Sequence, residues 1–154
     1  MKILMVCLGN ICRSPLAEGI LKHKLSDKNL TWTIESAGTS GWHVGELPDP
    51  RSIQVASKHG LDISDQRSRK FSGYDLESFD IIYAMDASNF NDILSQAKTD
   101  EERAKVKMIM NELSPGKNIG VPDPYFAGPD NTDGFEHVFQ MLSQACDKII
   151  ENYA

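Results

Sequence analysis

The sequence lacks long hydrophobic runs and has few cysteines, and both shortages exclude classes of protein. No apolar stretch among its 154 residues approaches the ~20 residues that are needed to span a bilayer. The first apolar run, residues 3–8, is too short for a secretory signal and leads into Gly9 and Asn10. Three cysteines cannot form a complete disulfide framework, so we expect a protein of the reducing cytoplasm.

Positive charge is also in short supply. The chain has 22 Asp and Glu against 16 Lys and Arg, which gives a formal net charge of −6. Non-specific binding to nucleic acid or to an anionic membrane surface requires a basic face, so we expect neither partner. An anionic ligand must therefore be held by a local arrangement of groups that works against the overall field.

Internal repeats and low-complexity tracts are absent, and what remains is the composition of an ordinary folded domain. Hydrophobic residues make up 40% and charged residues 25% of the chain, which argues against disorder. The length is that of one domain. We expect a single domain over residues 1–154, present as a monomer or a weak homo-oligomer.

Segments typical of strands and helices alternate, which predicts an α/β fold with a mostly parallel sheet. The pattern predicts strands at residues 2–6, 31–36, 79–84 and 104–110, with a helix as the alternative for the last of these. It predicts helices at residues 15–25, 50–59 and 133–152, and a further helix capped by Asp86. Ser14 is the expected N-cap of the first helix, Gly60 ends the second, and residues 111–132 form mostly loop.

The turn between the first strand and the first helix carries the most information. Residues 7–14 read Cys-Leu-Gly-Asn-Ile-Cys-Arg-Ser. In an open α/β sheet, ligands bind at the carboxyl ends of the strands. Gly9 and Asn10 tolerate left-handed conformations, so the loop can turn its N–H groups inward beside the positive end of the helix. The sequence predicts a cradle for a tetrahedral dianion such as phosphate, and we call residues 7–14 the phosphate loop.

The cysteine and the arginine of this loop predict a nucleophile and a group that holds the phosphate. The inward N–H groups and Arg13 favour the thiolate form of Cys7, which then faces a bound phosphorus as a nucleophile. Arg13 can grip two phosphate oxygens with its planar fork. Ser14 can donate a hydrogen bond to the sulfur, and Asn10 can hold the shape of the loop. Each residue alone has an ordinary structural explanation, but their order together favours catalysis.

The sequence does not supply a complete metal site, and the proton donor for the reaction must lie outside the phosphate loop. Cys7 and Cys12 have the spacing of a zinc half-site, but the sequence supplies no second pair of ligands, so we expect no metal. A leaving oxygen needs a proton, and no histidine neighbours Cys7. Asp123 is the leading candidate for the acid, because Pro122 and Pro124 stiffen the backbone on both sides of it.

Together with the run Asp123-Pro124-Tyr125, the phosphate loop closely resembles that of the low-molecular-weight protein tyrosine phosphatases. Supporting similarity lies at residues 36–39, Trp42, residues 48–51 and residues 84–86, so the resemblance covers nearly the whole chain. It implies a four-stranded parallel sheet of order 2-1-3-4 flanked by helices. It also implies no metal or organic cofactor, and hydrolysis in two steps through a phosphocysteine.

The resemblance implies a role for each matching residue. Cys7 would be the nucleophile, Arg13 the phosphate clamp, and Asp123 the general acid and then the general base. Many members carry a histidine where Gln66 stands, so we expect altered support behind Asn10. The other residues expected to contact the substrate or support the loop are Leu8, Gly9, Ile11, Cys12, Ser14, Ser36, Trp42 and Tyr125.

The expected substrates are phosphotyrosine-containing proteins or small aryl phosphates, because two aromatic walls above a deep phosphate site suit an aryl ring. Two alternatives remain open at this point. An arsenate reductase on the same fold would need further cysteines as a relay, and residues 79–98 contain none. A non-hydrolytic phosphate-binding or phosphocarrier module would not need both a clamping arginine and a remote acid. We also expect sensitivity to oxidation, with Cys12 close enough to Cys7 to trap it as a disulfide.

Overall fold

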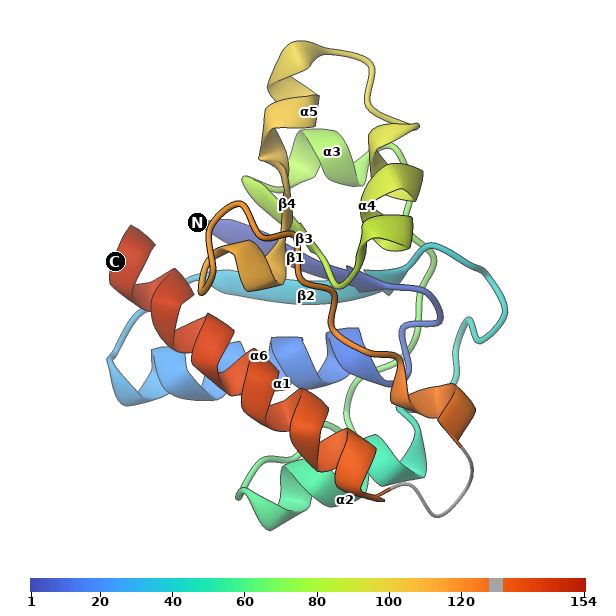
Figure 1. Ribbon diagram of the computed structural model, residues 1–154, viewed down its shortest axis with the longest axis vertical. Helices are drawn as coiled ribbons and strands as arrows, with labels where there is room; N and C mark the ends of the chain where they lie inside the picture. Colours follow the sequence, from blue (N-terminus) through green and yellow to red (C-terminus); the bar gives the residue numbers. More distant parts are fainter. Residues whose placement is uncertain (128–131) are drawn as a thin grey trace.

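Four parallel strands in the order β2-β1-β3-β4 form the sheet at the centre of the structure, a computed structural model that describes residues 1–127 and 132–154 (Figure 1). The strands are β1 (Lys2–Cys7), β2 (Thr33–Gly38), β3 (Ile81–Ala84) and β4 (Val106–Met108). The predicted fold class and strand order are confirmed. The fourth strand is shorter than the predicted 104–110, because a helix and a 3-10 turn directly flank it.

Helices cover both faces of this sheet. They are α1 (Arg13–Asp27), α2 (Pro50–Lys58), α3 (Asp75–Ser78), α4 (Ala87–Leu94), α5 (Asp100–Lys105) and α6 (Thr132–Tyr153), with 3-10 turns η1 (Ile109–Asn111) and η2 (Pro124–Ala127). Figure 1 shows α1, α2 and α6 on one side of the sheet and α3, α4 and α5 on the other. None of the helices in the described parts of the chain is long and apolar enough to cross a membrane.

Strand β1 is buried on both faces and fixes the position of the phosphate loop. Ile3, Met5 and Cys7 join the core under α1 and α6, whereas Leu4 and Val6 join the core on the opposite face. This alternation follows from the two-residue period of a strand. Because β1 lies between β2 and β3, its carboxyl end is the point where the strand order reverses, which is where open α/β sheets bind ligands.

The start of α1 differs from the prediction. Cys12 occupies the N-cap position, its side chain makes no capping hydrogen bond within the described residues, and Ser14 is already the second helical residue. The Ser14 hydroxyl is turned toward Cys7 and Asn10 instead, so it cannot cap the helix. An uncapped first turn leaves N–H groups that an anion can satisfy.

The other predicted helix boundaries agree with the structure. Asp86 caps α4 by accepting a hydrogen bond from the N–H of Asn89. Gly60 has a φ of +80° just beyond the end of α2. The predicted loop at 111–132 contains the end of η1 and all of η2, and its residues 128–131 lie outside the described residues.

Candidate active site

Asn10 is the structural centre of the phosphate loop. Its φ is +56°, the left-handed conformation that asparagine tolerates, whereas Gly9 does not have a positive φ. Gly9 is needed for space instead, since a Cβ there would lie 3.1 Å from Cδ2 of His43. The sequence therefore predicted the left-handed turn correctly at Asn10 and gave the wrong reason for Gly9.

A chain of side-chain hydrogen bonds runs behind the loop to the sulfur of Cys7. Asn10 Nδ2 donates to the hydroxyls of Ser36, at 2.9 Å, and Ser14, at 2.8 Å. The Ser14 Oγ lies 3.0 Å from Cys7 Sγ. Because Ser14 accepts from Asn10, its own hydrogen is available to the sulfur. The predicted network of Asn10, Ser14 and Ser36 is thus assembled around one thiol.

The end of β2 presses closely against the same loop. A Cβ on Gly38 would lie 2.8 Å from the carbonyl oxygen of Leu8 and 3.1 Å from the nitrogen of Asn10. Thr39 N–H donates to the Cys7 carbonyl, and Ser40 N–H donates to that of Leu8. No local pattern predicted this packing role of Gly38, although Gly38 follows a predicted strand.

Arg13 is buried to 2% exposure and is held along one edge of its guanidinium. One terminal nitrogen donates to Asp86 Oδ2 at 2.6 Å and to the Val121 carbonyl at 3.0 Å. The other lies 3.3 Å from Asp123 Oδ2. In the described part of the chain, no acceptor bonds to its Nε, which is buried. Nε and the weakly held terminal nitrogen can therefore donate hydrogen bonds to two oxygens of an anion.

The charges around Arg13 keep it protonated. Burial alone would lower the pKa of Arg13, but the Cys7 thiolate, Asp86 and Asp123 more than offset this and raise it. Asp86 has two functions, because its other oxygen caps α4. The sequence predicted that cap but not the pairing with Arg13, which depends on the ends of β1 and β3 being neighbours.

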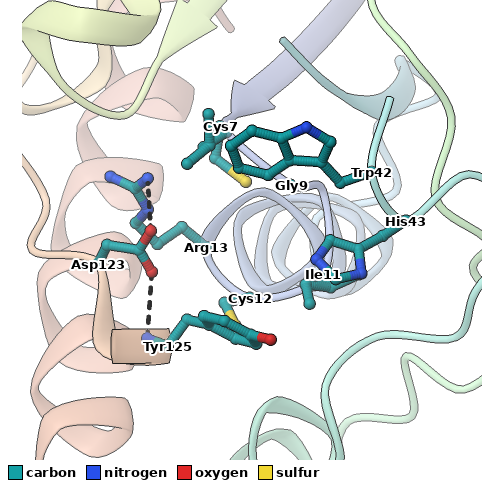
Figure 2. A pocket seen from close by; sticks show the side chains of 10 residues that line it. Cys7, Gly9, Ile11, Cys12, Arg13, Trp42, His43, Asp123 and Tyr125 are labelled. Atoms are coloured by element: carbon teal, nitrogen blue, oxygen red, sulfur yellow. Dashed lines mark hydrogen bonds and ion pairs between the residues drawn. The ribbon is translucent and has the colours of Figure 1, made fainter. Parts of the chain in front are cut away.

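Figure 2 shows how these groups meet in one pocket of about 140 Å³. The Cys7 sulfur faces the space between Arg13 and Asp123 on one side and Trp42 on the other. The lining residues are Cys7, Leu8, Gly9, Ile11, Cys12, Arg13, Trp42, His43, Asp123 and Tyr125. Every residue that was predicted to contact the substrate directly lines it or, for Asn10 and Ser14, lies directly behind it. His43 also lines the pocket, although it was not among the predicted site residues.

Two loops from distant parts of the chain form the upper walls of the pocket. We call residues 39–49 the mouth loop and residues 121–127 the acid loop. Trp42 of the mouth loop is 71% exposed, so it forms an open wall. Asp123 of the acid loop accepts a hydrogen bond from the N–H of Tyr125 at 3.1 Å. The Tyr125 ring meets the His43 ring edge-on, with centroids 6.0 Å apart.

This arrangement agrees with the comparisons with known proteins. The family model of the low molecular weight phosphotyrosine protein phosphatases matches residues 2–154. The chain belongs to this family. A phosphatase of this name from Schizosaccharomyces pombe is 39% identical, and the match covers 99% of this chain and 97% of the relative.

Solved structures of phosphatases share the fold over nearly their whole length. The protein tyrosine phosphatase of Entamoeba histolytica is 35% identical, with a TM-score of 0.89 over 98% of this chain and 95% of that one. A Drosophila protein described as an arginine phosphatase is 34% identical, with a TM-score of 0.90 over 99% and 98% of the two chains. The phosphatase fold and activity class therefore rest on both sequence and structure.

In this phosphatase, Gln66 does not take the place behind Asn10 that the resemblance implied. Its Nε2 donates to the Pro15 carbonyl at 3.1 Å, so the side chain lies against α1. The carbonyl oxygen of Asn10 accepts instead from the backbone N–H of Arg69 at 3.0 Å. The altered support behind Asn10 that we expected does not involve Gln66, because a backbone donor bonds to the Asn10 side chain instead.

The two other cysteines of the phosphatase are buried and protonated. Burial raises the pKa of Cys12, and the charge of Asp49 raises it further. Burial raises the pKa of Cys146 to about 12. All three cysteines are free. Within residues 1–127 and 132–154, no cluster of His, Cys, Asp and Glu could hold a metal ion.

Proposed function

We propose that this phosphatase hydrolyses phosphotyrosine and other aryl phosphate monoesters through a phosphocysteine formed on Cys7. One observation carries the proposal. The Cys7 sulfur, the guanidinium of Arg13 and the carboxyl group of Asp123 open onto the same small pocket (Figure 2), and no acceptor among the described residues bonds to the Nε of Arg13. The reaction needs a nucleophile, an oxyanion clamp and an acid, and these three groups supply them.

In the first step, the phosphate group occupies the loop and the Cys7 thiolate attacks phosphorus in line with the leaving oxygen. The S–P bond forms as the P–O bond to the aryl group breaks, and the carboxylic acid of Asp123 protonates the departing phenolate. Arg13 and the loop N–H groups bind the three other oxygens. The Ser14 hydroxyl stabilises the thiolate before attack.

In the second step, a water molecule attacks phosphorus on the side that the phenol has left. The Asp123 carboxylate takes the proton of the water, the O–P bond forms, and the S–P bond breaks to return the Cys7 thiolate. The Ser14 hydroxyl, 3.0 Å from the sulfur, lowers the energy of the leaving thiolate. The products are inorganic phosphate and the phenol, and Asp123 regains its proton for the next cycle.

The walls of the pocket favour an aryl substrate. Leu8 and Ile11 line its apolar part, and Trp42 and Tyr125 lie above it, so that a flat ring can stack while its phosphate reaches Cys7. Phosphotyrosine-containing proteins and small aryl phosphates are the proposed partners. We further propose a single domain over residues 1–154 that acts in the cytoplasm as a monomer or a weak homo-oligomer, without a cofactor.

The test compares five reactions with the same preparation. We expect kcat/KM to be highest for a phosphotyrosyl peptide and for p-nitrophenyl phosphate, and much lower for the matching phosphoseryl peptide, which cannot reach Cys7. A phosphoarginine peptide is the fourth substrate, because of the Drosophila relative. Arsenate with a thiol reductant is the fifth. A preference for phosphoarginine, or reduction of arsenate without phosphatase activity, would overturn the proposal.

A further inference from the structure

Ser68 lies outside the three loops of the pocket, yet it contacts the phosphate loop and the mouth loop. It is 6% exposed and belongs to residues 66–71, the segment that runs behind the phosphate loop. Its hydroxyl donates to the carbonyl oxygen of Gly9 at 3.1 Å. Its backbone N–H donates to the Glu46 carbonyl at 2.9 Å, and its carbonyl accepts from Gly45 N–H at 2.8 Å. One residue therefore joins the phosphate loop to the mouth loop.

A hydrogen bond to the Gly9 carbonyl also affects the orientation of the next N–H group of the phosphate loop. In a trans peptide, the C=O of Gly9 and the N–H of Asn10 point in opposite directions. A hydrogen bond that fixes this carbonyl therefore also fixes the direction of the Asn10 N–H. An anion cradle depends on the direction of its N–H groups, and Asn10 already has a left-handed φ of +56° that needs support from its surroundings.

A side chain of the mouth loop, that of His43, also lies against this peptide. The ring of His43 occupies the space beside Gly9 that a Cβ would need, and His43 also lines the pocket. The Gly9–Asn10 peptide is thus contacted by Ser68, which bonds to the mouth loop, and by His43, which belongs to it.

Ser68 is itself held rigidly by its neighbours. The carbonyl of Arg69 accepts from Gly38 N–H at 2.9 Å, and Phe71 N–H donates to the Gly38 carbonyl at 2.7 Å. The guanidinium of Arg69 bonds both oxygens of Asp75, at 3.1 and 3.2 Å. These contacts do not involve the Ser68 side chain, so removing its hydroxyl should leave the segment in place.

We propose that Ser68 is a positioning residue of the phosphatase, whose hydroxyl fixes the Gly9–Asn10 peptide to the mouth loop and thereby sets the affinity of the phosphate loop for an oxyanion. The inference rests on the proposed function for its meaning in catalysis. The binding of inorganic phosphate tests it separately, because no turnover is involved.

The experiment compares Ser68→Ala with Ser78→Ala. Ser78 is the matched control, since its hydroxyl also donates to a backbone carbonyl, that of Tyr74 at 3.0 Å, at an exposed site outside the pocket. We expect the Kd for inorganic phosphate, measured by calorimetry, to rise about 3- to 10-fold in Ser68→Ala, the effect of one lost hydrogen bond. KM for p-nitrophenyl phosphate should rise with it. Ser78→Ala should bind phosphate as the wild type does.

The outcomes separate positioning from a purely structural role. A weaker phosphate affinity with an unchanged Tm supports the proposal, as does recovery of affinity in Ser68→Thr, which keeps the hydroxyl. An unchanged Kd in Ser68→Ala overturns it, whether or not Tm falls, and so does an equal loss in Ser78→Ala. If the wild type fails to hydrolyse phosphotyrosine, the proposed function is lost, but the comparison of phosphate affinities still decides the role of Ser68.

Discussion

The phosphate loop and the acid loop line the same pocket but are held very differently. Side chains of the phosphate loop are buried and multiply bonded: Asn10, Arg13 and Ser14 are each no more than 2% exposed. Asp123 of the acid loop is partly exposed and bonds to Arg13 at 3.3 Å and to the N–H of its near neighbour Tyr125 at 3.1 Å. The nucleophile thus sits in a fixed frame, by which we mean the phosphate loop and the side chains bonded to it. Among the described residues, the acid has only the bonds to Arg13 and Tyr125 and is more exposed.

The difference fits the chemistry of each loop. Dipoles that stabilise a transition state act best when they are oriented before the substrate arrives, because no reorganisation is then needed. The acid must instead donate a proton in one step and take one from water in the next, so it must remain accessible. Arg13 links the two loops, and we expect a bound phosphate to compete with Asp123 for its weakly held nitrogen.

The largest expected effect comes from the fixed frame. Cys7→Ser should abolish turnover but leave binding of phosphate or vanadate nearly unchanged, because Arg13 and the loop N–H groups remain. Steady-state kinetics and calorimetry measure the two quantities. The matched control is Cys12→Ser, a second cysteine of the same loop, which should keep most activity. Hydrolysis by Cys7→Ser at a rate near that of wild type would show that the nucleophile is another residue.

Asp123→Asn tests the contribution of the acid loop separately from that of the frame. We expect turnover of poor leaving groups to fall by about 10²- to 10⁴-fold, the usual scale for a lost general acid. In single-turnover phosphorylation, the loss should shrink for acidic phenols, which leave without a proton. Asp92→Asn, an exposed carboxylate of α4 that does not line the pocket, should have no effect. Equal losses across all leaving groups would remove Asp123 from the role of acid.

Asn10→Ala tests how much the rigidity of the frame contributes. The change removes the hydrogen bonds to Ser14, Ser36 and the Arg69 N–H, and it places alanine in a left-handed conformation. We expect kcat/KM to fall about 10- to 100-fold, because several hydrogen bonds and the backbone preference are lost together. Ser36→Ala removes one of these bonds and should cost less. An Asn10→Ala enzyme as active as wild type would mean that the frame does not need this network.

The smallest effect is expected at Cys12, and it should appear only under oxidation. We propose that peroxide converts the Cys7 thiolate to a sulfenic acid, and that the Cys12 thiol then forms a disulfide with release of water. A reductant should restore wild-type activity, whereas oxidised Cys12→Ser should stay inactive. Burial raises the pKa of Cys12, so little of its attacking thiolate exists at neutral pH. The thiolate fraction grows as pH rises, and capture should then become faster. A bridge to Cys146 by mass spectrometry, or equal recovery of both proteins, would contradict this.

The sequence predicted most of the frame because most of its residues are contiguous in the chain. The residues of the phosphate loop, the buried strand before them and the helix after them could be recognised within one short stretch. Asp123 was found because two prolines mark it and the family resemblance supports it. The remaining contacts could not be found in this way, since they join residues that are far apart: Ser68 to Gly9 across 59 positions, and Arg13 to Asp86 across 73. Such pairs follow from the order of the strands rather than from any local pattern.

Two local predictions failed for a related reason. Ser14 looks like a helix cap and Gln66 like a replacement for a supporting histidine, but neither side chain makes the hydrogen bond that this role requires. Ser14 bonds to Asn10 and lies beside Cys7, and Gln66 bonds to the Pro15 carbonyl. A residue type restricts the bonds that a side chain can make, whereas the packing decides which bond is made.

The most direct test of the account is to trap the intermediate that the fixed frame and the separate acid imply. Asp123→Asn should slow the attack of water, so p-nitrophenyl phosphate, whose leaving group needs little help, should load the enzyme with a phosphoryl group. Rapid quenching and mass spectrometry should then find one phosphoryl group on the peptide that contains Cys7, and none in the Asp123→Asn, Cys7→Ser double variant. A phosphoryl group on any other residue, or release of p-nitrophenol with no labelled Cys7 at any time, would contradict the account.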